Sequence, residues 1–310
     1  LQGDWSSDVC SSDLTWVSEA QGWNLIALPF PSAPGKFRLL MNQFGEVLRF
    51  NVPDAGVPNR GVTPDTGDAA TDQVIDAIAY EQIITQKAVD DFPVSTKRAP
   101  NESAIHHEPG FFLQFINHIP IGHTEEEGKE NGPDSLLKIA RLATIPHGNS
   151  VLAMGTADKI PGPPTIPDED GLPERIGDRN VNTNQYLAPY KHFEDSPFFG
   201  NVPRTVPGFP GFFASNANAI LQFANPGAKV KNTTILNFDT KFRNDQLTGI
   251  PISNIPFVTR EADTTEVHAT FWVMELIRPD DYAPPEFIMQ YSQTVYLEFF
   301  DSDEPGKRIR

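Results

Sequence analysis

Short apolar, β-branched and aromatic runs recur along this chain, separated by proline, glycine and asparagine. Such punctuation is typical of antiparallel strands joined by turns, and helical periodicity is sparse. Residues 287–299 alternate between an apolar face and a more polar face, as a half-buried strand does. We therefore predict an all-β fold of about ten strands, forming an up-and-down barrel or a sandwich. The expected strands lie near residues 23–28, 37–42, 47–52, 77–85, 104–116, 137–145, 151–157, 233–242, 266–277 and 287–299.

Two stretches interrupt this pattern, and a third is ambiguous. Residues 54–72 are rich in Pro, Gly, Asp and Thr and predict a long loop. Residues 158–231 hold eleven prolines but also seven phenylalanines. Disordered linkers are poor in aromatic residues, so we expect an irregular insertion packed on a single domain of residues 15–310, in the manner of a lid. The spacing of apolar residues over 136–143 fits a short helix as well as a strand.

The balance of charged residues limits the classes of partner that the chain can bind. The chain has 24 basic and 41 acidic residues and a formal charge of −17. Nucleic acid is an unfavourable partner because its phosphates require clustered Lys and Arg. The longest apolar runs, such as residues 24–30 and 111–116, are far shorter than the roughly 20 residues of a membrane span. We expect an acidic, soluble, globular protein, and the sequence does not indicate a compartment.

The first fourteen residues do not resemble protein sequence. Residues 1–14 include Asp8-Val9-Cys10-Ser11-Ser12-Asp13-Leu14, which resembles a translated sequencing adapter. We expect an artefact of metagenomic assembly, a native Ser/Asp-rich tail being the alternative, so the start of the chain gives no information on targeting. Without Cys10 the chain has no thiol for a disulfide, a zinc or iron–sulfur site, or a nucleophile.

The sequence lacks the usual catalytic fingerprints but has two histidine clusters. It has no Walker loop, dinucleotide-binding glycine motif, His-Glu-x-x-His, Gly-x-Ser-x-Gly or EF-hand loop. Within residues 105–112, His106 and Glu108 share one face of an expected strand and His107 lies on the other. His106 and Glu108 could bind a metal, relay a proton or contact a ligand, or they could be purely structural.

The second cluster, residues 143–150, contains Pro146-His147-Gly148-Asn149. These residue types are typical of a turn between two strands, although a histidine at a barrel rim could still contact a ligand. Charged runs elsewhere, Glu125 to Glu127 near His118 and His123, and Asp168 to Asp170, are expected to be solvated faces.

The order of several short motifs resembles that of the nitrobindin-like haem-binding β-barrels, which belong to the calycin group with lipocalins and fatty-acid-binding proteins. The resemblance covers roughly residues 22–157 and 233–300 and leaves out the insertion. The motifs are Gly22-Trp23-Asn24, Phe37-Arg38, residues 46–50, Ala79-Tyr80-Glu81-Gln82, residues 106–112, Phe271-Trp272-Val273-Met274 and residues 289–295.

The resemblance implies a ten-stranded calycin-like barrel whose open end holds haem or another flat apolar ligand. His106 then lines the cavity as the histidine of a His-x-Glu-x-Gly motif, and Met274 falls at a cavity methionine. Nitrobindins bind the iron through a histidine near the last strand, but this chain has no histidine after His268. Either His106 or His147, or Tyr80, Tyr291 or Met274, ligates the iron instead, or the ligand is not haem. Larger bacterial haem-binding barrels resemble this chain in their Ile-Pro-His-Gly phrase, which favours His147.

Three functions follow as expectations. The first is binding of haem or a similar hydrophobic small molecule in the barrel cavity, with His106 and then His147 as the polar or metal contact. The second is an enzyme in the same cavity, either a haem-dependent peroxidase or isomerase or a cofactor-free catalyst using His106 and Glu108. The third is a structural module with a filled barrel. The oligomeric state, a homodimer included, stays open.

Overall fold

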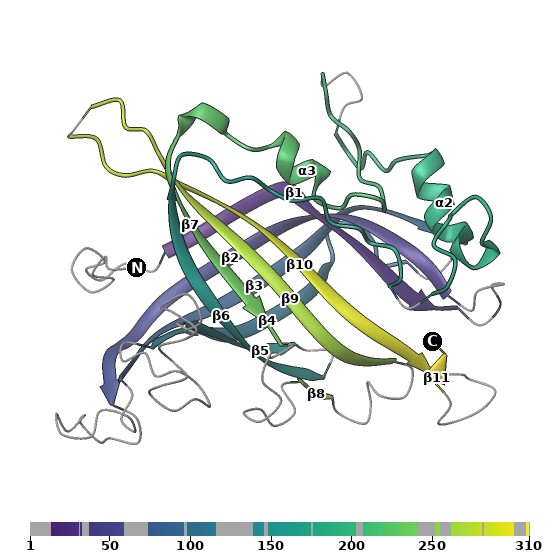
Figure 1. Cartoon of the computed structure of the whole chain (residues 1–310), viewed down its shortest axis with the longest axis horizontal. Helices are drawn as coiled ribbons and strands as arrows, with labels where there is room; N and C mark the ends of the chain where they lie inside the picture. Colours follow the sequence, from purple (N-terminus) through teal and green to yellow (C-terminus); the bar gives the residue numbers. More distant parts are fainter. Residues whose placement is uncertain are drawn as a thin grey trace, which may run out of the picture.

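The computed structural model is dominated by long antiparallel strands (Figure 1). It describes residues 14–30, 32, 37–58, 74–95, 98–115, 139–145, 148–174, 176–202, 207–240, 252–254, 262–280, 282–300 and 308–309. The strands are β1 (Leu14–Pro29), β2 (Phe37–Pro58), β3 (Val74–Phe92), β4 (Ala104–Phe115), β5 (Ile139–Ile145), β6 (Asn149–Pro161), β7 (Val230–Asp239), β8 (Ile252–Asn254), β9 (Ala262–Leu276), β10 (Phe287–Phe300) and β11 (Arg308–Ile309).

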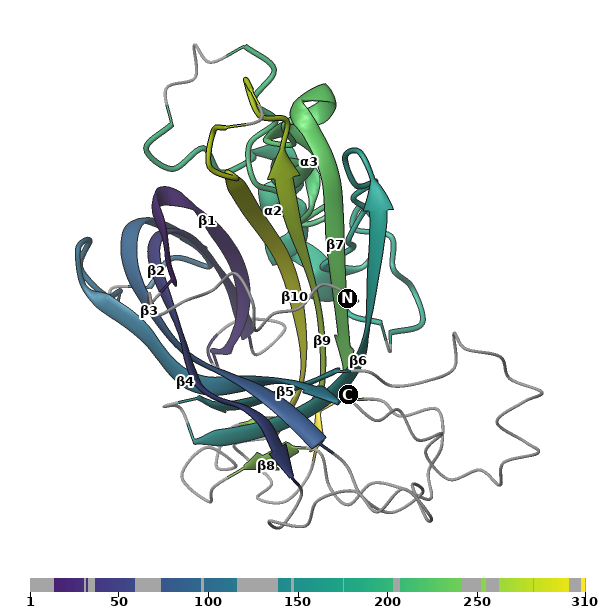
Figure 2. The same ribbon diagram turned by 90° about the vertical axis from the view of Figure 1, so that its left-hand side faces the viewer.

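The strands form one antiparallel sheet in nearly sequential order. The order is β1-β2-β3-β4-β5-β6-β7-β9-β10-β11, and the short strand β8 pairs with the start of β6. The sheet curves round into a nearly closed barrel (Figure 2). The predicted all-β, up-and-down barrel of about ten strands is confirmed, and the sandwich alternative is wrong because one sheet forms both walls.

Residues 37–58 form one strand where the sequence predicted two. Gly45 lies inside β2, beside a register shift between Gln43 and Phe44 against β3. A Cβ atom at Gly45 would lie 2.5 Å from the carbonyl oxygen of Glu19, so this glycine allows a close approach of β1 rather than a turn. Residues 139–145 of the ambiguous segment are strand β5.

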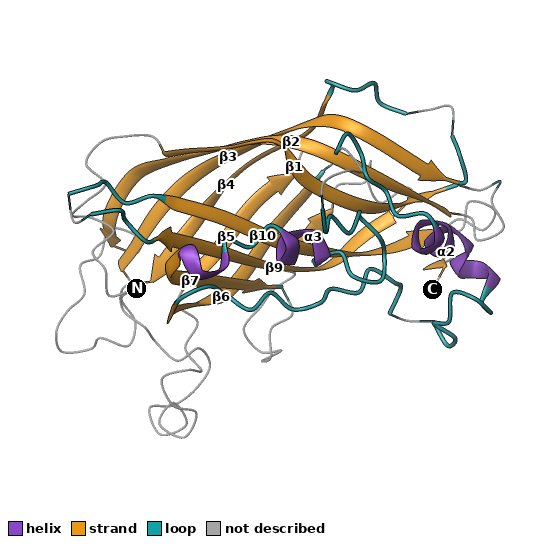
Figure 3. Cartoon of the chain, turned by 90° about the horizontal axis from the view of Figure 1, so that it is seen from above, coloured by secondary structure: helices purple, strands orange, loops and turns teal. Residues whose placement is uncertain are grey.

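The insertion leaves the barrel after β6 and returns at β7. It contains the short helices η3 (Gln185–Leu187), α2 (Ala188–Asp195), α3 (Ala219–Phe223) and η4 (Gly227–Lys229). None of the helices among the described residues is long and apolar enough to cross a membrane. Figure 3 shows α2 near the ends of β1 and β2, and α3 over β9 and β10.

Aromatic side chains attach the insertion to the barrel. Leu187, Tyr190 and Phe193 of the insertion form one buried cluster with β2, and Phe299 of β10 packs against the same cluster. Over the described residues, β1 and β10 do not pair with each other. The insertion therefore bridges the seam of the barrel by side-chain packing, whereas backbone hydrogen bonds join the other strands.

This packing predicts a contrast between two phenylalanines of the insertion. Phe193 is 0 % exposed and Phe223 is 43 % exposed. We expect Phe193→Ala to lower the free energy of unfolding by about 3–5 kcal/mol, since it leaves a cavity. The matched variant Phe223→Ala should cost about 1 kcal/mol or less. Urea unfolding followed by tryptophan fluorescence measures both, and equally small losses would contradict stable packing of the insertion.

Candidate functional site

The barrel interior brings together three of the residues expected at a ligand site. Tyr80 of β3 lies opposite Gly110 of β4, and His106 and Glu108 lie on the same face of β4 as Gly110. A Cβ at Gly110 would lie 2.6 Å from the Tyr80 ring, so the absent side chain makes room for that ring. The tyrosine hydroxyl donates a short hydrogen bond to Glu108.

Arg141 of β5, which the sequence analysis missed, completes this cluster. Its Nη2 donates to Glu108 Oε1 at 2.6 Å and its Nε donates to the Tyr80 hydroxyl at 3.1 Å. Its Nη1 donates to Gln293 Oε1 of β10 at 2.6 Å. The side chains of Arg141 and Glu108 are only 8 % and 2 % exposed, so the two charges form a buried ion pair.

The ion pair fixes the protonation of Glu108. Burial alone would raise the pKa of this carboxyl, but the charge of Arg141 and hydrogen bonds from His106 and Tyr80 outweigh burial and lower the pKa from 4.5 to about 2. Burial raises the pKa of Tyr80, which stays a neutral donor. Glu108 is therefore a carboxylate at neutral pH.

A second polar group lies beside the first. Gln82 donates to Glu46 Oε1 at 2.6 Å and to the Tyr291 hydroxyl at 3.1 Å, and Tyr291 donates to Glu46 at 3.2 Å. Burial raises the pKa of Glu46 against the opposing effect of these two donors. The interior polar groups are thus bonded to one another across β2, β3 and β10.

Aromatic rings pack against one another beside these polar groups. The rings of Tyr80 and Phe112 lie 5.0 Å apart, those of Phe112 and Phe271 5.4 Å apart, and those of Phe271 and Tyr291 5.3 Å apart. The guanidinium of Arg141 lies over the Phe271 ring at 5.4 Å. Beside Glu108 and Arg141, a cavity of about 10 Å³ remains, which is room for about one water molecule.

The cavity beside Glu108 and Arg141 is too small for a haem. Pockets for ligands of drug size measure roughly 300–1,000 Å³. His106 Nε2 lies 3.2 Å from Glu108 Oε2, so the imidazole faces a carboxylate that already forms an ion pair with Arg141. His147 lies outside the described residues, as do His118 and His123. Haem stays a prediction from the resemblance, and the described side chains would have to move to admit it.

Met274 is placed differently from the position that the resemblance implied. It is 0 % exposed and packs with Ile166, Val230 and Trp272, apart from the cluster that contains Phe238 and Phe271. Because side chains alternate along β9, Met274 faces away from Phe271 and lies under the insertion, outside the barrel interior.

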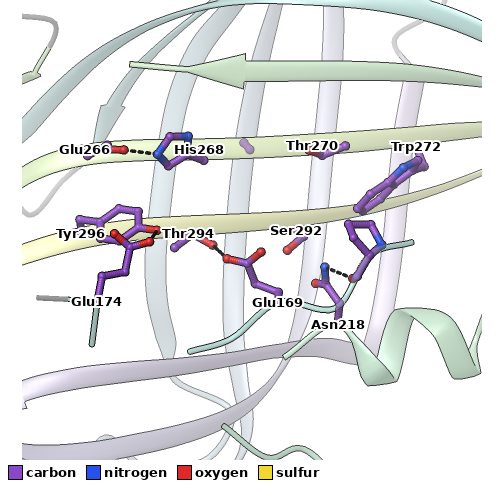
Figure 4. Close-up of a pocket in the computed structure, with 12 residues that line it drawn as sticks. Glu169, Glu174, Asn218, Glu266, His268, Thr270, Trp272, Ser292, Thr294 and Tyr296 are labelled. Atoms are coloured by element: carbon purple, nitrogen blue, oxygen red, sulfur yellow. Dashed lines mark hydrogen bonds and ion pairs between the residues drawn. The ribbon is translucent and has the colours of Figure 1, made fainter. Parts of the chain in front are cut away.

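A larger hollow lies on the outer face of β9 and β10, beneath the insertion (Figure 4). This outer groove has a volume of about 330 Å³. Twelve residues line it: Pro167, Glu169, Glu174 and Asn218 of the insertion, Glu266, His268, Ala269, Thr270 and Trp272 of β9, and Ser292, Thr294 and Tyr296 of β10. It is the larger of the two hollows described for this structure. None of the site residues that the sequence predicted lines it.

Carboxylates dominate the electrostatics of the outer groove. Glu169 accepts a hydrogen bond from Thr294 at 2.5 Å and Glu174 accepts one from Tyr296 at 2.6 Å. Burial raises the pKa of Tyr296, and the neighbouring carboxylates of Glu174, Glu169 and Glu266 raise it further. Among the described residues that line the groove there is no lysine or arginine. Glu169, expected on a solvated face, instead forms one wall of this site.

Comparisons of the chain with protein-family models, with curated proteins and with solved structures found no match.

The buried carboxylate predicts a specific acid sensitivity. The pKa of Glu108 falls from 4.5 to about 2 on folding, so the pair contributes on the order of 3 kcal/mol that is fully present above about pH 5. This contribution is lost as the pH falls from there toward 2. Urea unfolding at pH 6 and pH 3 should show a larger loss for the wild type than for Glu108→Gln. The exposed Glu81→Gln is the control, and equal losses for wild type and Glu108→Gln would contradict the pairing.

The small cavity beside Glu108 and Arg141 predicts that haem does not bind there. We expect hemin titration to give no saturable Soret shift, because the described interior beside Glu108 and Arg141 offers only about 10 Å³. Absorption spectra of wild type and His106→Ala, together with His147→Ala, check this. A saturable shift in the wild type that is lost in His106→Ala would overturn the assignment of a filled barrel.

Proposed function

We propose that this protein binds a small organic cation, of the amine class, in the outer groove between the insertion and strands β9 and β10. The observation that carries the proposal is the set of three carboxylates, Glu169, Glu174 and Glu266, in a groove without a lining lysine or arginine among the described residues. An ammonium group placed there gains ion pairs in a partly dehydrated site.

The remaining lining suits the organic part of such a ligand. The volume of about 330 Å³ lies at the small end of ligand pockets. Tyr296 offers ring surface for cation–π and apolar contact, Trp272 contributes a largely buried edge of the lining, and Ser292 and Thr270 offer hydroxyl groups. The negative formal charge of the whole chain, −17, favours the approach of cations.

In this proposal the barrel is a filled scaffold that presents the groove. Rings and the Arg141–Glu108 pair lie in its interior, which supports the third expectation from the sequence, a structural module with a filled barrel. Acid–base catalysis by His106 and Glu108 is less well supported, since a carboxyl with a pKa of about 2 is a poor general base near neutral pH.

Isothermal titration calorimetry with phenethylamine tests this function. We expect a Kd of roughly 0.1–1 mM in low salt for a ligand of this size, with weaker binding as salt rises. The neutral phenethyl alcohol and the anionic phenylacetate should bind at least about tenfold more weakly, because only the ammonium group pairs with the carboxylates.

Variants locate the binding. The double variant Glu169→Gln and Glu174→Gln keeps the shape and hydrogen-bond acceptors of the groove but removes two charges, and it should weaken phenethylamine binding about tenfold or more. Glu81→Gln, a carboxylate on the exposed side of β3, is the matched control and should leave binding unchanged. Equal binding of the amine and the alcohol, or an equal effect of the control, would overturn the proposal.

A further inference from the structure

Three potential metal ligands converge at one end of the outer groove. Asp239 of β7 lies directly opposite His268 of β9 in the sheet register. Glu266 precedes His268 by two residues and therefore projects from the same outer face of β9. Two hydrogen-bonded strands thus hold all three side chains, which gives their Cα atoms fixed relative positions.

The donor atoms already lie close together. One donor atom from each residue lies within 4.8 Å of the other two. His268 Nδ1 lies 3.3 Å from Asp239 Oδ2, and His268 Nε2 contacts Glu266 Oε1. Ligands that share a metal at about 2.0–2.2 Å are at most about 4.4 Å apart, which is close to the separation of these donor atoms. The two carboxylates contact different ring nitrogens of His268, so one of them would have to rotate to share an ion that is bound by a single nitrogen.

The surroundings orient the histidine and leave space for water. The Tyr296 ring packs edge-on against the His268 ring, with centroids 5.6 Å apart. The side chains of His268 and Asp239 are 34 % and 47 % exposed, so an ion can enter from solvent. Glu266 and His268 also line the groove, whose open volume can hold the water molecules that complete a coordination shell.

We propose that Asp239, Glu266 and His268 bind a divalent transition-metal ion of the zinc type. The imidazole nitrogen favours this class, because magnesium and calcium are bound almost entirely through oxygen ligands. The two proposed sites share Glu266 and adjoin at His268, but Asp239 does not line the groove and Glu169 and Glu174 are not among the three metal ligands, so variants at those positions separate the two proposals.

Titration of tag-free, chelator-treated protein with zinc chloride tests the proposal. The expected result is saturable 1:1 binding that weakens at least tenfold in His268→Ala and in the isosteric Asp239→Asn. Calcium chloride should bind at least about tenfold more weakly than zinc. Cobalt(II) gives a second readout, because visible absorption bands of the bound ion should appear in the wild type and be lost in both variants.

A matched control comes from another histidine–carboxylate pair on the outer surface. His107 Nε2 lies 3.0 Å from Glu81 Oε1. Among the described residues, no third histidine, cysteine or carboxylate joins this pair to form a possible metal site. His107→Ala should leave zinc and cobalt binding unchanged. Absence of saturable zinc binding, or an equal loss in His107→Ala, would overturn the proposal.

The zinc proposal and the organic-cation proposal can be tested separately. Asp239→Asn should weaken zinc binding and leave phenethylamine binding unchanged, whereas Glu169→Gln should do the reverse. Thermal unfolding of each variant without ligand confirms that it is folded. Zinc binding that depends on Glu169 but not on Asp239 would contradict the metal site and leave the organic-cation site standing.

Discussion

The buried charge of Arg141 is the constraint on which the barrel interior depends. An uncompensated guanidinium in this position would be strongly destabilising, and Glu108, Tyr80 and Gln293 from three other strands satisfy it. The pairing also specifies the sheet register, because a slip of β5 by one residue would turn Arg141 outward and leave Glu108 buried without a cation. Aromatic rings then pack around this pair in the barrel interior.

The larger of the two described hollows lies on the outer surface of the barrel and not in its interior. The insertion between β6 and β7 covers the outer face of β9 and β10, where Ile166 and Leu221 pack near Trp272. Where the insertion carries the carboxylates Glu169 and Glu174 instead of apolar residues, a groove separates it from β9 and β10. One segment thus supplies both a part of the hydrophobic core and a wall of the proposed binding site.

Local periodicity predicted most of the long strands, although it divided β2 in two, and it correctly placed His106 and Glu108 on one face of β4. It did not reveal Arg141, since the pairing depends on how β4 and β5 meet, and an arginine in a short apolar run gives no signal of its partner. The groove was missed because its walls are distant in sequence, near residue 170 and near residues 266–296. Met274 was misplaced for another reason. Residues 271–274 of β9 are apolar on both faces of the strand, so the alternation of side chains does not show which of them point into the barrel.

The seam between β1 and β10 affects how the chain folds. Trp23 of β1 packs on Phe198 and Phe209, and these contacts join segments that are far apart in the sequence. Such contacts form only after a long stretch of chain has lost its conformational freedom, so the seam is expected to close late. Over the described residues β1 and β10 do not pair with each other, so both strands present backbone groups that are templates for pairing with another chain unless the seam is covered. The insertion therefore also protects the edges of the sheet against aggregation.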